Sequence, residues 1–207
     1  MEKIKEYFNK LFENPVCELN FKNNFELLIS VILSAQCTDK RVNITTEKLF
    51  KKYKTPQDFA NLKEQDLEKE IFSCGFYKNK AKNIIKASQS ILTDFNGEVP
   101  NNFEDLIKLA GVGRKTANVV CSVGFGGDAI AVDTHILRVA NRLGLAKTKD
   151  PTKCEFALRK VFNKKDWSRL HYQMVLFGRY YCKARKPECE ICELKNQCNY
   201  YKEKKEK

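Results

Sequence analysis

Hydrophobic residues recur along this chain mainly at intervals of three and four positions, the spacing of one face of an α-helix. The range 23–35 is the clearest case, because Phe25, Leu28, Ile32 and Ala35 form a stripe behind the asparagine pair that opens it. No stretch shows the sustained alternation of apolar and polar residues that predicts a β-strand. The sequence therefore predicts an all-α protein.

Capping and turn residues divide the rest of this pattern into separate helices. The predicted helices are one opened by the cap Thr55 and Pro56, one from about Leu67 to Gly75, one from Tyr77 to Phe95 ended by Asn96-Gly97, one opened by Pro100 to Asn102, and three that start near Thr134, Pro151 and Asp166. The chain contains no internal repeat and no Pro- or Ser-rich linker. Its length fits one large or two small domains.

Charge and composition narrow the class of protein. The 207 residues include 38 Lys and Arg against 26 Asp and Glu, a formal net charge of +12, which favours a polyanionic partner. Residues 1–14 are charged and amphipathic, unlike a signal peptide, and the apolar run 25–35 is too short to cross a bilayer. Five of the nine cysteines are scattered, as expected for reduced thiols. We therefore expect an intracellular protein without a membrane partner.

The other four cysteines lie close together near the C-terminus: Cys182, Cys189, Cys192 and Cys198, separated by six, two and five residues. Four cysteine thiolates can hold a [4Fe–4S] cluster. A four-cysteine zinc site is the rival, although the CxxC pairs of zinc ribbons usually stand further apart. Disulfides or unpaired core thiols fit poorly in so short and polar a segment. The spacing predicts a metal centre and leaves the choice between iron–sulfur and zinc open.

Two glycines lie between helical patterns in the segment LAGVGRKTANVV (109–120). Gly111 and Gly113 flank Val112, permit a sharp turn and remove Cβ atoms from its outer face. The N–H groups of this turn and of the first turn of the next helix, Arg114 to Thr116, can donate to a phosphate. An ordinary turn between helices is the alternative. In a basic chain we favour a helix-hairpin-helix, which binds a DNA backbone without reading its sequence.

Lys115 and Asp133 are the candidate catalytic residues. The positive end of the second hairpin helix and the neighbouring Arg114 disfavour an ammonium on Lys115, and partial burial would add to this. A neutral amine can form a Schiff base, whereas a solvated, phosphate-contacting lysine is the plainer alternative. Asp133 stands where the helix at Thr134 begins and is expected to cap it. A carboxylate there could polarise a nucleophile and stabilise positive charge on a sugar.

Taken together, these segments resemble a known family. The residues LAGVGRKTANVV, AIAVDTH, FGRYYC and the cysteine spacing are similar to the endonuclease III family, DNA glycosylase/AP lyases of the helix-hairpin-helix superfamily. ELNF (18–21), FELLISVILSAQCTD (25–39) and GFYKNKAKNI (75–84) match the family pattern in register, so the resemblance runs nearly end to end.

The resemblance implies two helical domains with a DNA-binding groove between them. One is a six-helix barrel over 22–128 that contains the helix-hairpin-helix at about 104–123. The other is an iron–sulfur cluster domain built from 1–21 and 129–207, with the cluster loop at 182–198. The cofactor implied is a [4Fe–4S] cluster on the four cysteines.

The resemblance also implies a function in base excision repair. The protein would remove oxidised or damaged pyrimidines from duplex DNA and cleave the abasic site by β-elimination through a Schiff base on Lys115, with Asp133 as the catalytic aspartate. Gln36 matches the residue that fills the gap left by an extruded nucleotide, and Phe76 stands where relatives commonly place a leucine wedge. The residues expected to bind DNA are Gln36, Phe76, Gly111, Val112, Gly113, Arg114, Thr116, Lys183, Arg185 and Lys186. We expect a monomer in a bacterial-type cytoplasm, associated with the nucleoid.

Two other functions stay open on the sequence. Adenine-mismatch glycosylases of the superfamily usually lack a lysine at the hairpin position and carry a further C-terminal domain, whereas this chain has Lys115. A catalytically silent DNA-binding module could combine the hairpin with a zinc site. Borohydride trapping on abasic DNA distinguishes them, because only a lyase with a reactive lysine becomes covalently linked.

Overall fold

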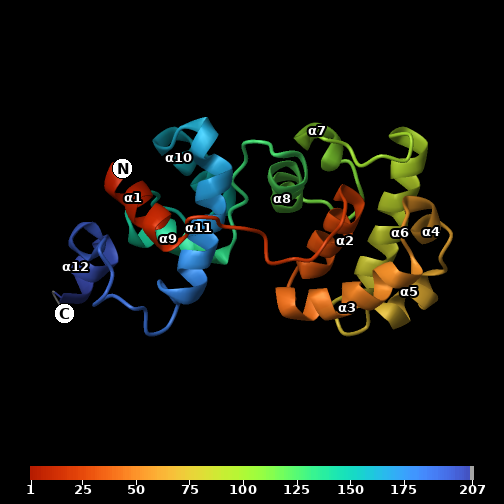
Figure 1. Ribbon diagram of the computed structural model, residues 1–207, viewed down its shortest axis with the longest axis horizontal. Helices are drawn as coiled ribbons and strands as arrows, with labels where there is room; N and C mark the ends of the chain where they lie inside the picture. The colour runs from red at the N-terminus through yellow and green to blue at the C-terminus, as the bar shows by residue number, and fades with distance from the viewer. Residues whose placement is uncertain (206–207) are drawn as a thin grey trace. The chain divides into compact units, whose positions relative to one another are not determined.

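The computed structural model describes residues 1–205, which contain α-helices, two short 3-10 helices and no β-strand (Figure 1). The all-α prediction is therefore confirmed. Contacts divide the chain into two compact units, Cys17–Gly127 and the combination of Met1–Val16 with Asp128–Lys207. The first unit contains α2 (Asn24–Ser34), α3 (Asp39–Lys52), α4 (Pro56–Ala60), α5 (Glu64–Glu70), α6 (Tyr77–Asp94), α7 (Phe103–Leu106) and α8 (Arg114–Phe125). The second contains α1 (Glu2–Leu11), α9 (Thr134–Arg142), α10 (Pro151–Val161), α11 (Trp167–Tyr180), α12 (Asn199–Lys205) and the 3-10 helices Lys164–Asp166 and Lys195–Gln197.

Helix α2 forms the centre of the unit Cys17–Gly127. Most of its residues are buried, and Leu27, Ile29 and Leu33 are fully enclosed, as expected for a helix that is apolar on nearly all sides. It packs against α3, α6 and α8. The side chain of Asn23 accepts a hydrogen bond from the Glu26 N–H and caps α2, as its position before the apolar stripe predicts.

Most predicted helix boundaries agree with the structure. Thr55 caps α4 and Pro56 is its first residue, while Asp58 completes a capping box. Asn96 and Gly97, with φ angles of 53° and 81°, follow the end of α6. The starts of α7, α9, α10 and α11 lie at or next to the predicted positions, at Phe103, Thr134, Pro151 and Trp167.

The helix predicted from Leu67 to Gly75 is shifted, because α5 begins at Glu64 and ends at Glu70. Acidic residues in its first turn favour the earlier start, since carboxylates are stabilised at a helix N-terminus. Ile71 and Cys74 follow in a turn closed by a hydrogen bond from the Cys74 N–H to the Ile71 carbonyl, and both side chains are fully buried. Burial of these two residues requires a turn that the helical spacing alone does not reveal.

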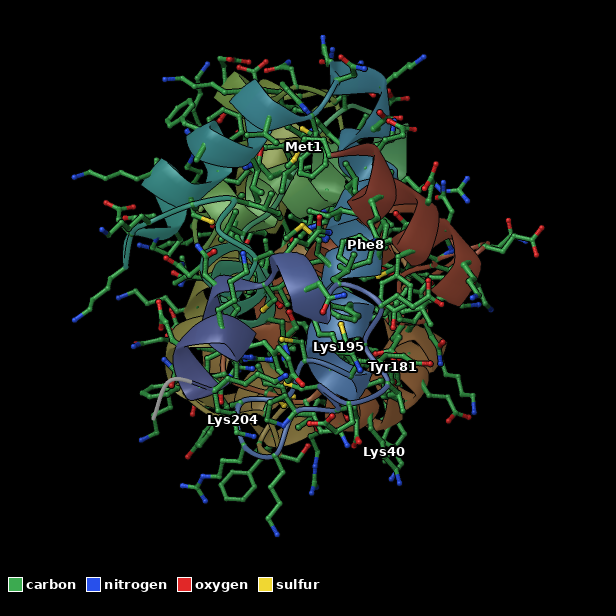
Figure 2. The ribbon with its side chains drawn as sticks, turned by 90° about the vertical axis from the view of Figure 1, so that its left-hand side faces the viewer. Met1, Phe8, Lys40, Tyr181, Lys195 and Lys204 are labelled. Atoms are coloured by element: carbon green, nitrogen blue, oxygen red, sulfur yellow. The ribbon has the colours of Figure 1, made fainter. Side chains whose placement is uncertain are left out.

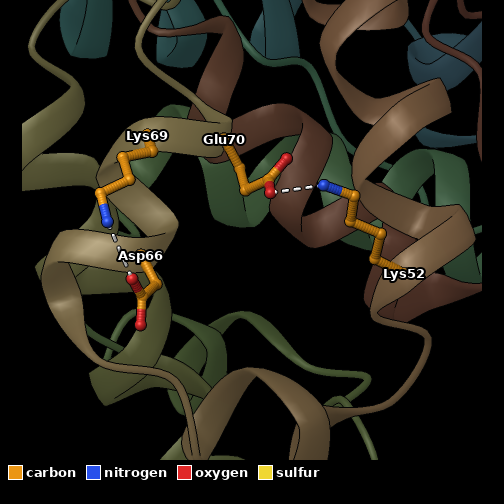
Figure 3. Close-up of polar contacts among 4 residues, drawn as sticks. All are labelled: Lys52, Asp66, Lys69 and Glu70. Atoms are coloured by element: carbon orange, nitrogen blue, oxygen red, sulfur yellow. Dashed lines mark hydrogen bonds and ion pairs between the residues drawn. The ribbon is translucent and has the colours of Figure 1, made fainter.

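Two ion pairs lie in this region, but they do not determine how its helices pack. Lys52 at the end of α3 lies 2.6 Å from Glu70 of α5, and Lys69 lies 3.2 Å from Asp66 within α5 (Figure 3). At least one partner in each pair is well exposed, so each contributes at most about 1 kcal/mol to stability. Apolar burial therefore determines how α3, α5 and α6 pack.

The N-terminal segment is a packed helix of the second unit. The apolar face of α1, on which Phe8 lies (Figure 2), buries Ile4, Tyr7 and Phe8. The Phe8 ring lies 5.1 Å from the Phe177 ring of α11. The amphipathic pattern of residues 1–14 thus reflects core packing. Among residues 1–205, no helix combines the length and apolar character needed to cross a membrane.

Candidate catalytic and DNA-binding residues

The glycine turn joins α7 to α8 and leaves the start of α8 open. Gly113 occupies the N-cap position, and no side chain caps this end of the helix. A Cβ atom on Gly113 would meet nothing within 4 Å, so its face is free to receive a ligand. Backbone N–H groups at an uncapped helix N-terminus suit an anion such as a phosphate.

Gly111 has the turn backbone expected of it and also allows a close approach to α6. Its φ angle is +77°, and a Cβ atom there would lie 2.8 Å from Cβ of Asn83 on α6. Gly111 is therefore needed for the close approach of the turn to α6, and only Gly113 opens the outer face. Val112 is buried, so its backbone alone can face a ligand. The Arg114 guanidinium lies 5.0 Å from the centre of the Phe103 ring, which links α8 to α7.

Lys115 is the second residue of α8, in the first turn as predicted. Its side chain is exposed, so the partial burial expected from the sequence is not found. Thr116 follows in the same turn and is half-buried. An exposed amine in a helix turn without a side-chain cap can meet a sugar whose phosphate is held by the same turn.

Asp133 caps α9, as predicted, and does so with one oxygen only. Oδ1 accepts hydrogen bonds of 2.8 Å from the N–H groups of His135 and Ile136. Oδ2 accepts no hydrogen bond from any residue in the range 1–205. Such capping bonds hold the carboxylate in one orientation, and Oδ2 is left available for a substrate.

Gln36 and Phe76 lie in adjacent loops of the unit Cys17–Gly127. Both are exposed, and both have left-handed backbones, with φ angles of 54° and 58°. A Cβ atom on Gly75 would lie 3.6 Å from the Gln36 carbonyl oxygen, so the two loops approach closely. The structure thus brings together two residues that are forty positions apart in the sequence.

The four clustered cysteines line one pocket, together with apolar and aromatic residues that include Leu143, Phe177, Tyr181 and Tyr200. Within residues 1–205, no group of three or more His, Cys, Asp or Glu side chains is arranged around a single metal ion. Four cysteines that line one pocket match the thiolate ligand set of a [4Fe–4S] cluster.

Two arginines that the sequence analysis did not single out hold the cysteine segment. Arg142 of α9 donates to the carbonyl oxygens of Lys183 (2.7 Å) and Ala184 (3.1 Å) and to Sγ of Cys182 (3.3 Å). Arg138, one turn earlier, donates to the carbonyl oxygens of Gly178 (2.7 Å) and Cys182 (3.0 Å). Their spacing of four along α9 is the only sequence feature that could have identified them. Both guanidinium groups donate hydrogen bonds to backbone carbonyls that accept none within a regular helix.

The basic residues after Cys182 divide into two kinds. Lys183 Nζ lies 2.7 Å from Glu188 Oε1, which offsets its charge within the loop. Arg185 and Lys186 are exposed, and Lys186 has a left-handed backbone with a φ angle of 48°. Arg185 and Lys186 are therefore better placed than Lys183 to contact a phosphate.

Comparison with known proteins gives one consistent result. Residues 29–164 match the HhH-GPD superfamily base excision DNA repair protein family, and residues 182–198 match the iron-sulfur binding domain of endonuclease III. Endonuclease III of Rickettsia conorii is 49% identical over 201 residues, which cover 97% of this chain and 96% of that protein. Endonuclease III of Bacillus subtilis is 50% identical over 189 residues, covering 91% and 86%. Among solved structures, a trapped endonuclease III–DNA covalent intermediate with an estranged adenine matches with a TM-score of 0.94 and 47% identity, covering 99% of this chain and 98% of that one.

Proposed function

Because the chain belongs to the endonuclease III family of base excision DNA repair proteins, we propose that its substrates are damaged pyrimidines and abasic sites in duplex DNA. Its activity is that of a bifunctional enzyme, a DNA N-glycosylase that is also an abasic-site lyase. The trapped covalent DNA complex of a relative agrees with a lysine Schiff-base mechanism. We propose further that the protein works as a monomer on the nucleoid DNA of a bacterial-type cytoplasm.

The observation that carries the proposal is the position of Lys115, exposed in the first turn of an uncapped helix. With the damaged nucleotide turned out of the stack, the amine of Lys115 attacks C1′ of the deoxyribose, and the base departs with the electrons of the glycosidic bond. Loss of a proton from nitrogen and opening of the sugar ring then give a Schiff base. Removal of a proton from C2′ expels the 3′ phosphate by β-elimination.

Asp133 supplies the negative charge that this sequence of steps needs. Its Oδ2 atom is free of protein hydrogen bonds within residues 1–205, while Oδ1 is held by the start of α9. The carboxylate stabilises positive charge that develops on the sugar as the base leaves. A carboxylate can also accept a proton that is released in these steps.

DNA contacts would come from three surfaces of the chain. The open start of α8, with Gly113 at its N-cap, would hold a backbone phosphate without reading sequence. Gln36 and Phe76 would enter the duplex where the damaged nucleotide has left. Arg185 and Lys186 would contact further phosphates, which predicts binding that weakens as salt increases.

The cofactor is a [4Fe–4S] cluster, and we propose Cys182, Cys189, Cys192 and Cys198 as its ligands. When bound, the cluster supplies four metal–thiolate bonds that tie together a segment with few large apolar residues. Arg138 and Arg142 hold the same segment from the protein side. The role that follows is structural: together they present the basic residues after Cys182.

Replacing Lys115 by Gln tests the proposal. Wild-type protein, mixed with an abasic duplex and borohydride, should form a covalent protein–DNA band on a denaturing gel, and K115Q should form none while DNA binding is largely kept. Lys69→Gln, an exposed lysine of α5, is the matched control and should trap like the wild type. Persistent trapping by K115Q would assign the Schiff base to another amine.

A further inference from the structure

Lys80 is a buried lysine with an unusual set of partners. Its side chain is 6% exposed, and Nζ donates to the carbonyl oxygens of Leu33 (2.8 Å) and Ala35 (2.7 Å). Among residues 1–205 no carboxylate lies within ion-pair distance of it. An ammonium buried without a carboxylate is costly, and burial lowers the pKa of Lys80. A residue kept at such a cost needs a reason beyond core packing.

The two carbonyls that Lys80 binds lie at the end of α2. Carbonyls in the last turn of a helix have no partner within the helix, and a cation there is favoured by the helix dipole. The Ala35 carbonyl belongs to the peptide bond that joins Ala35 to Gln36. The hydrogen bond from Lys80 therefore fixes the plane of the peptide that leads directly into Gln36.

The backbone of Lys80 reaches the second loop. Its N–H donates to the Phe76 carbonyl oxygen at 3.1 Å, the bond that starts α6. One residue thus bonds to the peptide before Gln36 with its side chain and to Phe76 with its backbone. Gln36 and Phe76 both hold left-handed backbones, a strained conformation that persists only where the surrounding structure imposes it.

Other neighbours of Lys80 also come from the loops of Gln36 and Phe76. Its ammonium interacts with the thiols of Cys37 and Cys74, one from each loop. Burial raises the pKa of the Cys37 thiol, and the neighbouring Cys74 adds to this. A protonated thiol competes weakly for the ammonium, so the charge of Lys80 is directed at the two carbonyls.

We propose that Lys80 is a positioning residue for nucleotide extrusion: its ammonium holds the peptide that leads into Gln36, so that the Gln36 side chain enters the duplex as the nucleotide leaves. This inference rests on the proposed role of Gln36. Lys80 itself touches no DNA and acts through Gln36. Its loss should therefore impair the step in which the gap is filled and leave the lysine chemistry intact.

The test compares K80M, Q36A and the double variant on two substrates. On a duplex with one oxidised pyrimidine, such as thymine glycol, kcat/KM for excision should fall about tenfold in each single variant, the size expected from losing charge-assisted hydrogen bonds. The double variant should be no worse than either single one, because the two residues act in series. On a single-stranded abasic oligonucleotide, which has no gap to fill, borohydride trapping should keep its wild-type rate.

Lys82→Met is the matched control, since it removes an exposed lysine from the same helix, and it should excise like the wild type. K80Q keeps an N–H donor and should lose less activity than K80M; it replaces K80M if circular dichroism shows that K80M does not fold. The inference is overturned if K80M or its replacement keeps full duplex activity, if its loss multiplies with that of Q36A, or if single-strand trapping falls in parallel. A wild-type protein that forms no trapped complex would instead overturn the proposed function, and this inference with it.

Discussion

At the scale of single residues, the two carboxylate oxygens of Asp133 have different roles: one caps a helix, and the other is available for chemistry. Oδ1 caps α9 through two backbone N–H groups, whereas Oδ2 accepts no hydrogen bond from residues 1–205. Asparagine caps a helix about as well as aspartate but carries no charge. Substitution by asparagine can therefore remove the proposed chemistry and leave the helix intact.

We predict that Asp133→Asn lowers kcat for base excision at least about a hundredfold, the usual size of a general acid–base contribution. The melting temperature should stay close to that of the wild type, because the amide oxygen of the substituted side chain can still accept the hydrogen bonds that cap α9. Single-turnover excision and thermal unfolding measure the two effects separately.

Asp150→Asn provides the matched control. Asp150 caps α10 in the same way, with Oδ1 accepting from the N–H groups of Thr152 and Lys153. This variant should excise at the wild-type rate. Equal losses from both variants would contradict a specific role for the charge of Asp133 in excision.

At the scale of secondary-structure elements, α4 shows how a short helix is fixed by its ends. It has five residues, too few to be stable alone, and its capping box joins Thr55 to Asp58. Asp58 accepts hydrogen bonds from the N–H groups of Lys54 and Thr55, which lower its pKa below the ordinary value of 3.8. Folding therefore favours the ionised carboxylate.

We predict that Asp58→Ala destabilises the fold by about 1 kcal/mol at neutral pH. Because the pKa of Asp58 is lowered by folding, its contribution is present above pH 3.8 and is lost as pH falls through the lowered value. The difference between wild type and variant should thus shrink on acidification from pH 5 to about pH 3. Urea unfolding followed by circular dichroism at each pH measures it.

The control for this change is Asp66→Ala in α5. Asp66 pairs with Lys69 at 3.2 Å, and both side chains are exposed, so its removal should cost less than about 0.5 kcal/mol at any pH. A difference between wild type and D58A that stays constant with pH would show that the carboxylate charge of Asp58 does not matter.

At the scale of the whole molecule, the cysteine segment 182–198 depends on contacts made far along the chain. Arg138 and Arg142 of α9 bond to its carbonyls, and the pocket that the cysteines share is also lined by aromatic residues such as Phe177 and Tyr200. The segment has only short 3-10 structure of its own. Loss of the cluster should therefore loosen this segment first.

We predict that Cys198→Ser removes the yellow-brown colour, a broad absorption near roughly 400 nm expected of a [4Fe–4S] protein. Hydrogen exchange in residues 182–198 should accelerate, whereas exchange in α2 should not change. Cys121→Ser, at a half-buried cysteine of α8, should keep the colour. A colourless wild type that contains zinc would contradict the cluster assignment.

The sequence by itself determined the features that depend on residues a few positions apart. Hydrophobic spacing identified the helices, caps such as Asn23, Thr55 and Asp133 placed their starts, and the clustered cysteines indicated a metal centre. The residues of the glycine turn and their family resemblance indicated the hairpin and Lys115. These features are local because capping, periodicity and ligand spacing act over one or two helical turns.

Only the tertiary structure decided the features that join distant segments. It showed that α5 ends at Glu70 so that Ile71 and Cys74 can be buried, and that Gly111 is required by Asn83. It showed that Lys80 donates hydrogen bonds to carbonyl oxygens 45 and 47 positions earlier in the chain. Arg142 likewise donates to carbonyl oxygens about forty positions later. Such contacts depend on the path of the whole chain, because a buried hydrogen bond selects its partner by position in space and leaves no periodic trace in the sequence.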